Sequence, residues 1–147
     1  MIPHAWPDSG TLATIASVIT AFAVAMLFFR IQRELQMAKE LEINWIPWAD
    51  WLLFGAAWVS VLLVILPLVA AHPDSSIYRL IPPAACGASS ILVVGYTLAI
   101  LAHYRLIFSG GRTGARSNPE PGERGVVFAT LAVAAAEFLW ALYLHGL

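Results

Sequence analysis

Charge, cysteine and enzyme motifs are all scarce in this chain. Of its 147 residues, 12% are charged, whereas a soluble domain carries about a quarter. The single cysteine, Cys86, excludes a disulfide within one chain. A net charge of −1 supplies no basic field, so we expect no nucleic-acid partner. The HExxH, CxxC and GxSxG patterns do not occur, which leaves catalysis open and favours a role without it.

Hydrophobic residues are abundant, at 60% of the chain, and they are concentrated in four long runs. The runs are residues 11–29, 51–71, 80–102 and 125–144, and the first three contain no charge. About 20 apolar residues in a helix cross a hydrocarbon core of about 30 Å. Four such runs leave too little polar chain to cover them in water, so the sequence predicts an integral membrane protein.

We expect an all-α fold, because backbone polar groups in lipid must be satisfied within helices or closed barrels. The long, continuously apolar runs do not resemble the short alternating strands of a barrel. The prediction is one membrane domain with a bundle of four transmembrane helices, at residues 10–42, 48–71, 81–108 and 125–145. Residues 109–124 are rich in Gly, Pro, Ser and Arg and predict a flexible basic loop.

The first helix is expected to continue beyond its apolar run, since residues 30–42 are rich in strong helix formers. We interpret this extension as a solvated helix, with a docking surface for another subunit as the alternative. Pro82 and Pro83 suit the first turn of the third helix. The small residues that follow them would allow a second helix to approach closely.

Basic residues are distributed very unevenly and predict the orientation in a plasma (inner) membrane. Seven of the eight lie between the first and second runs or between the third and fourth, and only Arg79 lies on the other side. The positive-inside rule then makes these two loops cytoplasmic and both termini external. The second of the two loops carries Arg105, Arg112, Arg116 and Arg124.

Glu137 is the only charged residue in any of the four runs. Because a carboxylate in lipid needs a partner, water or a proton, we expect Glu137 to face protein or a water-filled path. Thr130 lies on the same helix face at i−7, together with Ala134 and Ala141. Ser17 and Thr20 form a similar stripe on the first helix, and their hydroxyls are candidate donors to the Glu137 carboxyl.

Other side chains suggest alternatives. Three tryptophans spaced by three residues predict an interfacial belt at the headgroup level: Trp45, Trp48 and Trp51. His72 and His145 fall at the same predicted depth, and two such histidines can ligate a haem. We expect no cofactor, and this haem is the alternative.

These patterns favour a small ion channel or pathway for cations or protons. Several copies would form a homo-oligomer in the bilayer, with Glu137, Thr130, Ser17 and Thr20 along the path. The alternative is a non-catalytic accessory or structural subunit of a larger membrane complex. A haem-binding or other membrane redox protein is the third reading. The ion, the number of copies and the partner are not encoded in any motif.

Overall fold

The computed structural model describes residues 7–40, 47–104 and 120–145, and these are almost entirely helical. The helices are α1 (Ser9–Glu40), α2 (Asp50–Val59), η1 (Ser60–Ile65), α3 (Leu66–Ala70), α4 (Ser76–His103) and α5 (Glu120–His145). Because α2, η1 and α3 follow one another without a break, they form a single rod. Four helical stretches are long and apolar enough to cross a membrane: Ser9–Arg33, Asp50–Ala70, Ser76–His103 and Pro121–Leu144. The prediction of an all-α, four-helix membrane bundle is confirmed.

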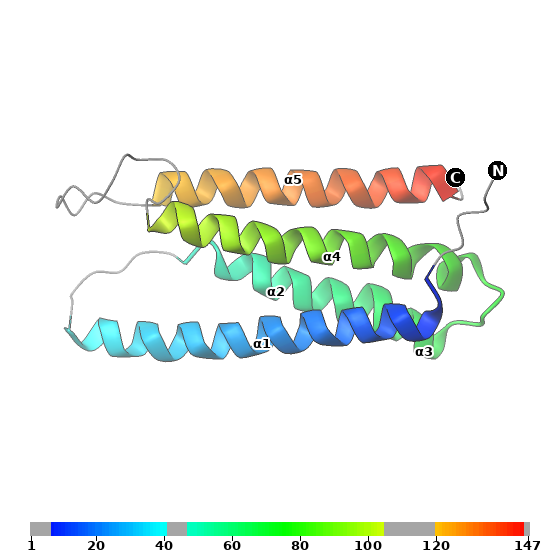
Figure 1. The fold of residues 1–147 in the computed structure, drawn as a ribbon, viewed down its shortest axis with the longest axis horizontal. Helices are drawn as coiled ribbons and strands as arrows, with labels where there is room; N and C mark the ends of the chain where they lie inside the picture. Colours follow the sequence, from blue (N-terminus) through cyan, green and yellow to red (C-terminus); the bar gives the residue numbers. More distant parts are fainter. Residues whose placement is uncertain (1–6, 41–46, 105–119, 146–147) are drawn as a thin grey trace.

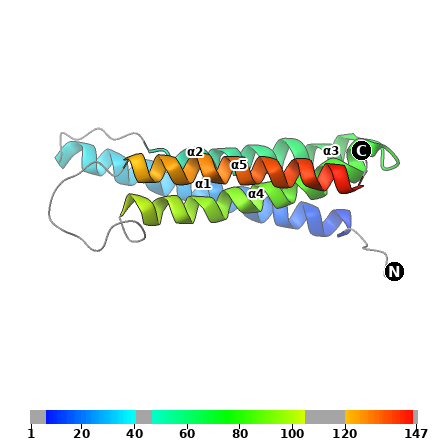
Figure 2. The ribbon, with the colours of Figure 1, turned by 90° about the horizontal axis from the view of Figure 1, so that it is seen from above.

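The four rods lie side by side, with α1 and α5 on the outside and the α2 rod and α4 between them (Figure 1). The view from above is consistent with this order, because α5 is nearest to the viewer there and α1 is farther away (Figure 2). In the most apolar stretch of α4 half of the residues are buried inside the protein, whereas in the corresponding stretches of α1 and α5 only 17% are. The α4 helix is therefore the centre of the bundle, and α1 and α5 present most of their surface outward.

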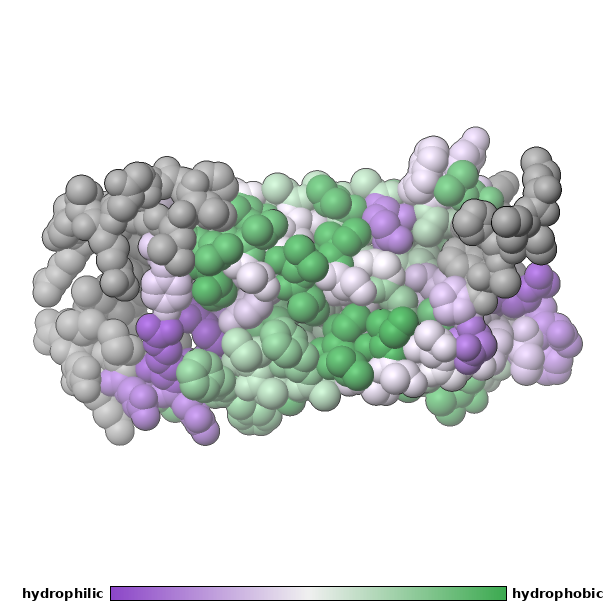
Figure 3. Space-filling model, viewed as in Figure 1, coloured by the Kyte–Doolittle hydropathy of each residue, from purple (hydrophilic) through white to green (hydrophobic). Residues whose placement is uncertain are grey.

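One end of the bundle is rich in basic side chains. There α1 and α4 end and α2 and α5 begin, and we call it the basic end (at the left in Figure 1). The surface shows a mostly hydrophobic middle with hydrophilic residues gathered toward its ends (Figure 3). This banding is what a bilayer requires of a spanning bundle. That the basic end faces the cytoplasm stays a prediction.

Two helices begin at side-chain caps. The Asp8 carboxylate accepts from the Thr11 backbone N–H at 3.0 Å and from the Thr11 hydroxyl at 2.7 Å. The Ser75 hydroxyl accepts from the Tyr78 N–H at 3.2 Å, which satisfies an amide that the first turn of α4 leaves unpaired. Because of this cap α4 begins at Ser76, and the expected start at residue 81 is wrong.

The earlier start places Pro82 and Pro83 inside α4, at its seventh and eighth positions, and not in its first turn. They are buried together with the small residues Ala84, Ala85 and Ala88, so this part of α4 does allow close packing, as predicted. The helix ends at His103, five residues before the expected end, and residues 105–119 lie outside the described residues.

The second rod contains a π-helical segment, η1, just before Pro67. The Leu66 N–H donates to the Val61 carbonyl, five residues back. A proline clashes with the carbonyl four residues before it and offers no N–H, and one wider turn relieves this conflict. The chain thus passes Pro67 through a π-helical segment followed by the short α3.

The α5 helix begins at Glu120, five residues earlier than expected, with Pro121 in its first turn. Proline is well accepted there because the first amides of a helix have no internal partner. The expected loop 109–124 is therefore wrong over residues 120–124: Arg124 lies on a helix. The rest of that loop, with Arg105, Arg112 and Arg116, lies outside the described residues.

Candidate functional site

Glu137 lies on the face of α5 that packs against α4, the most extensive contact between two helices of the bundle. On the same face Thr130 and Ala134 are buried, and Ala141 is half-buried. The predicted stripe thus exists and faces protein, as expected for Glu137. We call this contact between α4 and α5 the seam.

Two glycines of α4 make room for the polar side chains of the seam. A Cβ atom built on Gly87 would collide with the Glu137 carboxyl carbon, at 2.7 Å. One built on Gly95 would collide with the Cβ of Thr130, also at 2.7 Å. Since the two helices are antiparallel, Gly87 and Gly95 oppose Glu137 and Thr130 in order. Because each glycine has no side chain, the polar side chain of α5 fills the space beside it.

The Glu137 carboxyl has a buried oxygen, Oε2, with no hydrogen-bond partner among the described residues. A charged carboxylate so placed is unfavourable by about 2.5–3.5 kcal/mol on insertion scales. A neutral carboxyl removes most of this penalty. The unpartnered Oε2 therefore distinguishes Glu137 from Thr130, the other polar side chain of the predicted stripe.

The expected hydrogen bonds from α1 to Glu137 are wrong. The Thr20 hydroxyl donates to the Ala16 carbonyl of its own helix at 2.8 Å, and Ser17 is exposed. The α1 and α5 helices lie at opposite sides of the bundle, with α4 and the α2 rod between them (Figure 1). Thr130 is the only member of the predicted pathway that shares a face with Glu137.

A second acidic site, which the sequence did not predict, lies at the basic end. Glu123 of α5 is fully buried. Its Oε1 accepts from the Ala49 backbone N–H at 2.7 Å, and its Oε2 lies 2.6 Å from Nδ1 of His103. One carboxyl thus joins the start of α5, the start of α2 and the end of α4.

Helix dipoles favour opposite charges on the two members of this pair. Glu123 lies in the first turns of α5 and caps the start of α2 through Ala49, and helix N-termini stabilise anions. His103 is the last residue of α4, and a helix C-terminus stabilises a cation. The helix ends therefore add to the hydrogen-bonded contact between Glu123 and His103.

Next to this pair, Arg30 of α1 contacts Asp50 of α2, with Nε to Oδ1 at 3.2 Å. The described residues that follow in the extension of α1, such as Gln32 and Arg33, are exposed as expected, whereas Arg30 is only 5% exposed. Its side chain lies inside the bundle because Asp50, in the first turn of α2, receives it. The basic end therefore holds a compact set of ionic groups from four helices.

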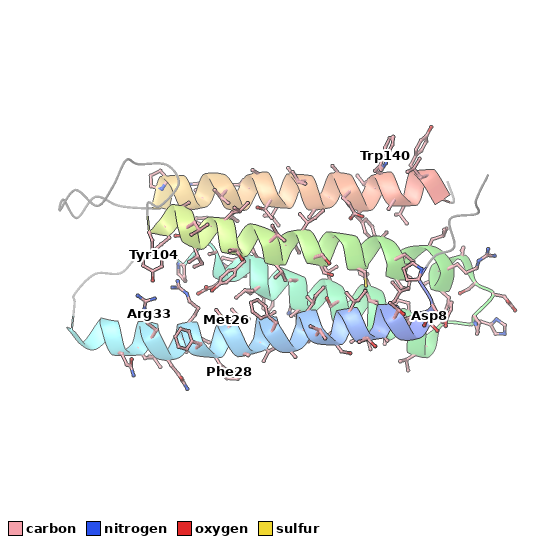
Figure 4. The ribbon with its side chains drawn as sticks, viewed as in Figure 1. Asp8, Met26, Phe28, Arg33, Tyr104 and Trp140 are labelled. Carbon is pink, nitrogen blue, oxygen red and sulfur yellow. The ribbon has the colours of Figure 1, made fainter. Side chains whose placement is uncertain are left out.

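Arginine side chains close this end over aromatic rings. Arg33 reaches from α1 toward Tyr104 at the end of α4, with its guanidinium 5.5 Å from the ring centre (Figure 4). The Arg124 guanidinium lies 5.1 Å from the Trp48 ring centre. Such cation–π contacts contribute about 0.5–1 kcal/mol at exposed sites. Trp51 is exposed and Trp45 lies outside the described residues, so the interfacial belt stays a prediction.

The histidines expected to hold a haem are not both described. His72 is an exposed side chain that lies 3.7 Å from Asp74. The side chain of His145 lies outside the described part, so the structure does not test the haem alternative. Among the described residues there is no cluster of three His, Cys, Asp or Glu side chains that could hold a metal ion.

The sequence contained one signal for the missed site. Glu123, Thr130 and Glu137 are spaced by seven residues, which places them on one face of a continuous helix. Because we expected α5 to start at residue 125, Glu123 was assigned to a loop. The contact between His103 and Glu123 had no local signal, since it joins two helices.

No protein-family model, curated protein or solved structure matches this chain. Function is therefore argued from the seam and the basic end themselves.

Proposed function

We propose that the protein is an ion-pathway protein of the membrane, with the proton as the ion and Glu137 as its binding group. The observation that carries this proposal is the buried Oε2 of Glu137, which has no hydrogen-bond partner among the described residues. A structural carboxyl is normally fixed by hydrogen bonds, because an unpaired buried polar atom is unfavourable by about 1–3 kcal/mol. A proton-exchanging carboxyl has to remain available to water instead.

The surroundings favour a proton over a larger cation. Calcium takes six to eight oxygen ligands, and magnesium requires six in octahedral geometry. The Glu137 carboxyl packs against Gly87, a residue without a side chain, and no second acidic group contributes to a metal cluster among the described residues. A proton needs only the one carboxyl.

Proton flux into liposomes tests the proposal. We expect Glu137→Gln to lower the flux about a hundredfold or more, as the loss of a positioned proton-transfer group does. The amide is nearly isosteric, so the seam should stay packed. Glu137→Asp keeps a titratable group and should retain part of the flux.

A matched control is Thr97→Val on α4. Thr97 is exposed, and its hydroxyl only donates to the Val93 carbonyl of the same helix. We expect this variant to conduct like the wild type. Undiminished flux in Glu137→Gln would refute the proposal.

A homo-oligomer is part of the proposal, because α1 and α5 bury little of their surface within one chain. The Glu137 carboxyl faces α4 of its own chain, which favours one path in each copy over a shared ring of carboxylates. Native mass spectrometry from nanodiscs gives the number of copies. If the monomeric form still conducts protons after it is reconstituted into liposomes, each chain carries its own path.

The second candidate, an accessory subunit, is favoured by the extension of α1. The helix continues to Glu40, past the end of its span at Arg33, and projects beyond the neighbouring helices (Figure 1). Leu35 in this part is 61% exposed. A partner that co-purifies in fixed stoichiometry and is lost in Leu35→Lys would support this role. A wild type that purifies alone and conducts protons would exclude it.

A further inference from the structure

The seam carries polar side chains at three depths. Glu123 of α5 opposes His103 of α4 at the basic end, and Thr130 and Glu137 follow at intervals of seven residues. At a rise of 1.5 Å per residue, each interval is about 10 Å along the helix axis. All three side chains of α5 point to the same neighbouring helix, so they mark one line through the bundle.

We propose that His103 is the group that exchanges protons with the solution at the basic end of the seam, and that Glu123 positions its imidazole. This inference rests on the proposed function, the conduction of protons along the seam. It adds a second proton-binding site, at the other end of α5 from Glu137.

Exposure decides which member of the pair meets the solution. The His103 side chain is 18% exposed, whereas that of Glu123 is 1% exposed. A proton arriving from the basic end therefore reaches the imidazole first. Histidine is also a common proton-transfer group in proteins.

Glu123 is suited to hold the imidazole and not to take its proton. Its Oε1 is occupied by the Ala49 N–H at 2.7 Å, and the starts of α2 and α5 favour the carboxylate. The remaining oxygen, Oε2, is 2.6 Å from Nδ1 of His103. A carboxylate in this place accepts a hydrogen bond from the Nδ1–H and fixes the orientation of the ring.

Among the described residues at this end, several other charged and titratable groups make contacts of their own. Arg30 pairs with Asp50 across α1 and α2, and Arg33 lies over the ring of Tyr104, which itself packs edge-on against His103 at 5.2 Å between ring centres. Tyr96 is buried on α4. The Arg30 and Asp50 charges oppose each other, and Glu123 lies in direct contact with His103.

The proton balance is simple. A proton from the solution converts the neutral imidazole of His103 to the imidazolium, and its release toward the seam restores the neutral ring. The next polar group, Thr130, is too far for a direct hydrogen bond, which needs about 2.5–3 Å. For the proton to continue from there to Glu137, the proposal requires water to enter between the two helices.

The test measures proton uptake into vesicles of known protein orientation while the pH is stepped on one side. We expect the wild type to respond to the pH at the basic end. His103→Gln should lower proton uptake from that side by about a hundredfold, which is the smallest effect usually seen when a positioned proton-transfer group is lost. The exposed histidine at the opposite end provides the control, since His72→Gln should leave uptake unchanged. Wild-type uptake in His103→Gln would overturn the inference.

A second measurement separates this inference from the proposed function. The ring-carbon signal of His103 is followed by NMR against pH in the folded wild type and in Glu123→Gln. We expect the wild-type signal to respond to pH, and we expect Glu123→Gln to change that response because it removes the carboxylate that holds the ring. If the protein conducts no protons, the proposed function fails, and this titration still decides whether His103 binds a proton beside Glu123. A ring that remains in one state between about pH 5 and pH 8 overturns the inference.

Discussion

Replacing Gly95 by alanine adds a methyl group at a place that α5 already occupies. The new Cβ would lie 2.7 Å from the Cβ of Thr130, and Thr130 is itself only 7% exposed. Neither atom is the end of a flexible side chain. The two helices therefore have to separate along the seam.

The magnitude follows from two opposing effects. Alanine is favoured over glycine in a helix by about 1 kcal/mol, and an extra carbon in a tightly packed contact destabilises by about 1–3 kcal/mol. Gly55→Ala provides a matched variant, because its Cβ would meet only Leu92 Cδ1, at an ordinary 3.6 Å. Both variants gain the helix propensity. The difference between them isolates the collision, and we expect Gly95→Ala to be less stable by about 1–3 kcal/mol.

Reversible unfolding in mixed micelles, followed by tryptophan fluorescence, measures the free energy of unfolding of each variant. Thr130→Gly in the Gly95→Ala background removes the colliding side chain, so the two substitutions should couple by at least about 0.5 kcal/mol in a double-mutant cycle. Equal stability of Gly95→Ala and Gly55→Ala, or strict additivity in the cycle, would show that α4 and α5 do not meet at Gly95.

Three further outcomes are expected. Glu123→Ala should destabilise the fold by about 3–5 kcal/mol, since it removes one partner of a buried ionic contact. Glu123→Gln, which preserves an oxygen for the Ala49 N–H, should lose less in the same unfolding assay. Ser75→Ala should cost about 1 kcal/mol by removing the cap of α4; an unchanged unfolding free energy would show that the cap is dispensable. Hydrogen bonds from the Thr11 side chain and backbone lower the pKa of Asp8. The stability that this cap supplies is therefore present above the ordinary pKa of Asp8 and is lost as the pH falls through the lowered one. An NMR titration of the Asp8 carboxyl in Thr11→Val should show a higher pKa, and an identical titration in both proteins would contradict the assignment.

Hydrophobic runs predicted the four helices because length and composition alone decide whether a segment can span a bilayer. The residues at which helices begin and end were harder to predict from the sequence. The Ser75 cap and Pro121 moved two starts five residues toward the N-terminus, since caps and first-turn prolines act through single residues that runs of apolar composition do not register. The shift at α5 mattered most, because it placed Glu123 on a helix.

For the candidate site, the sequence identified Glu137 and its face but not what that face meets. Periodicity on one helix relates Glu137 to Thr130, and it says nothing about the neighbouring helix. The expectation that Ser17 and Thr20 would donate to the carboxyl failed for this reason. Small residues on α1 and α4 suited Glu137 equally well, and the order of packing placed Gly87 there.

By itself, then, the sequence determined that the chain is a bundle of membrane-spanning helices with one carboxyl in an apolar span, because hydrophobic length and charge are properties of the chain. Only the tertiary structure decided which helix covers that carboxyl and that Glu123, His103, Arg30 and Asp50 gather at the basic end. In lipid no hydrophobic driving force selects one helix pairing over another. Close fit at glycines and contacts between distant ionic groups make that selection, and both exist only once the helices have packed.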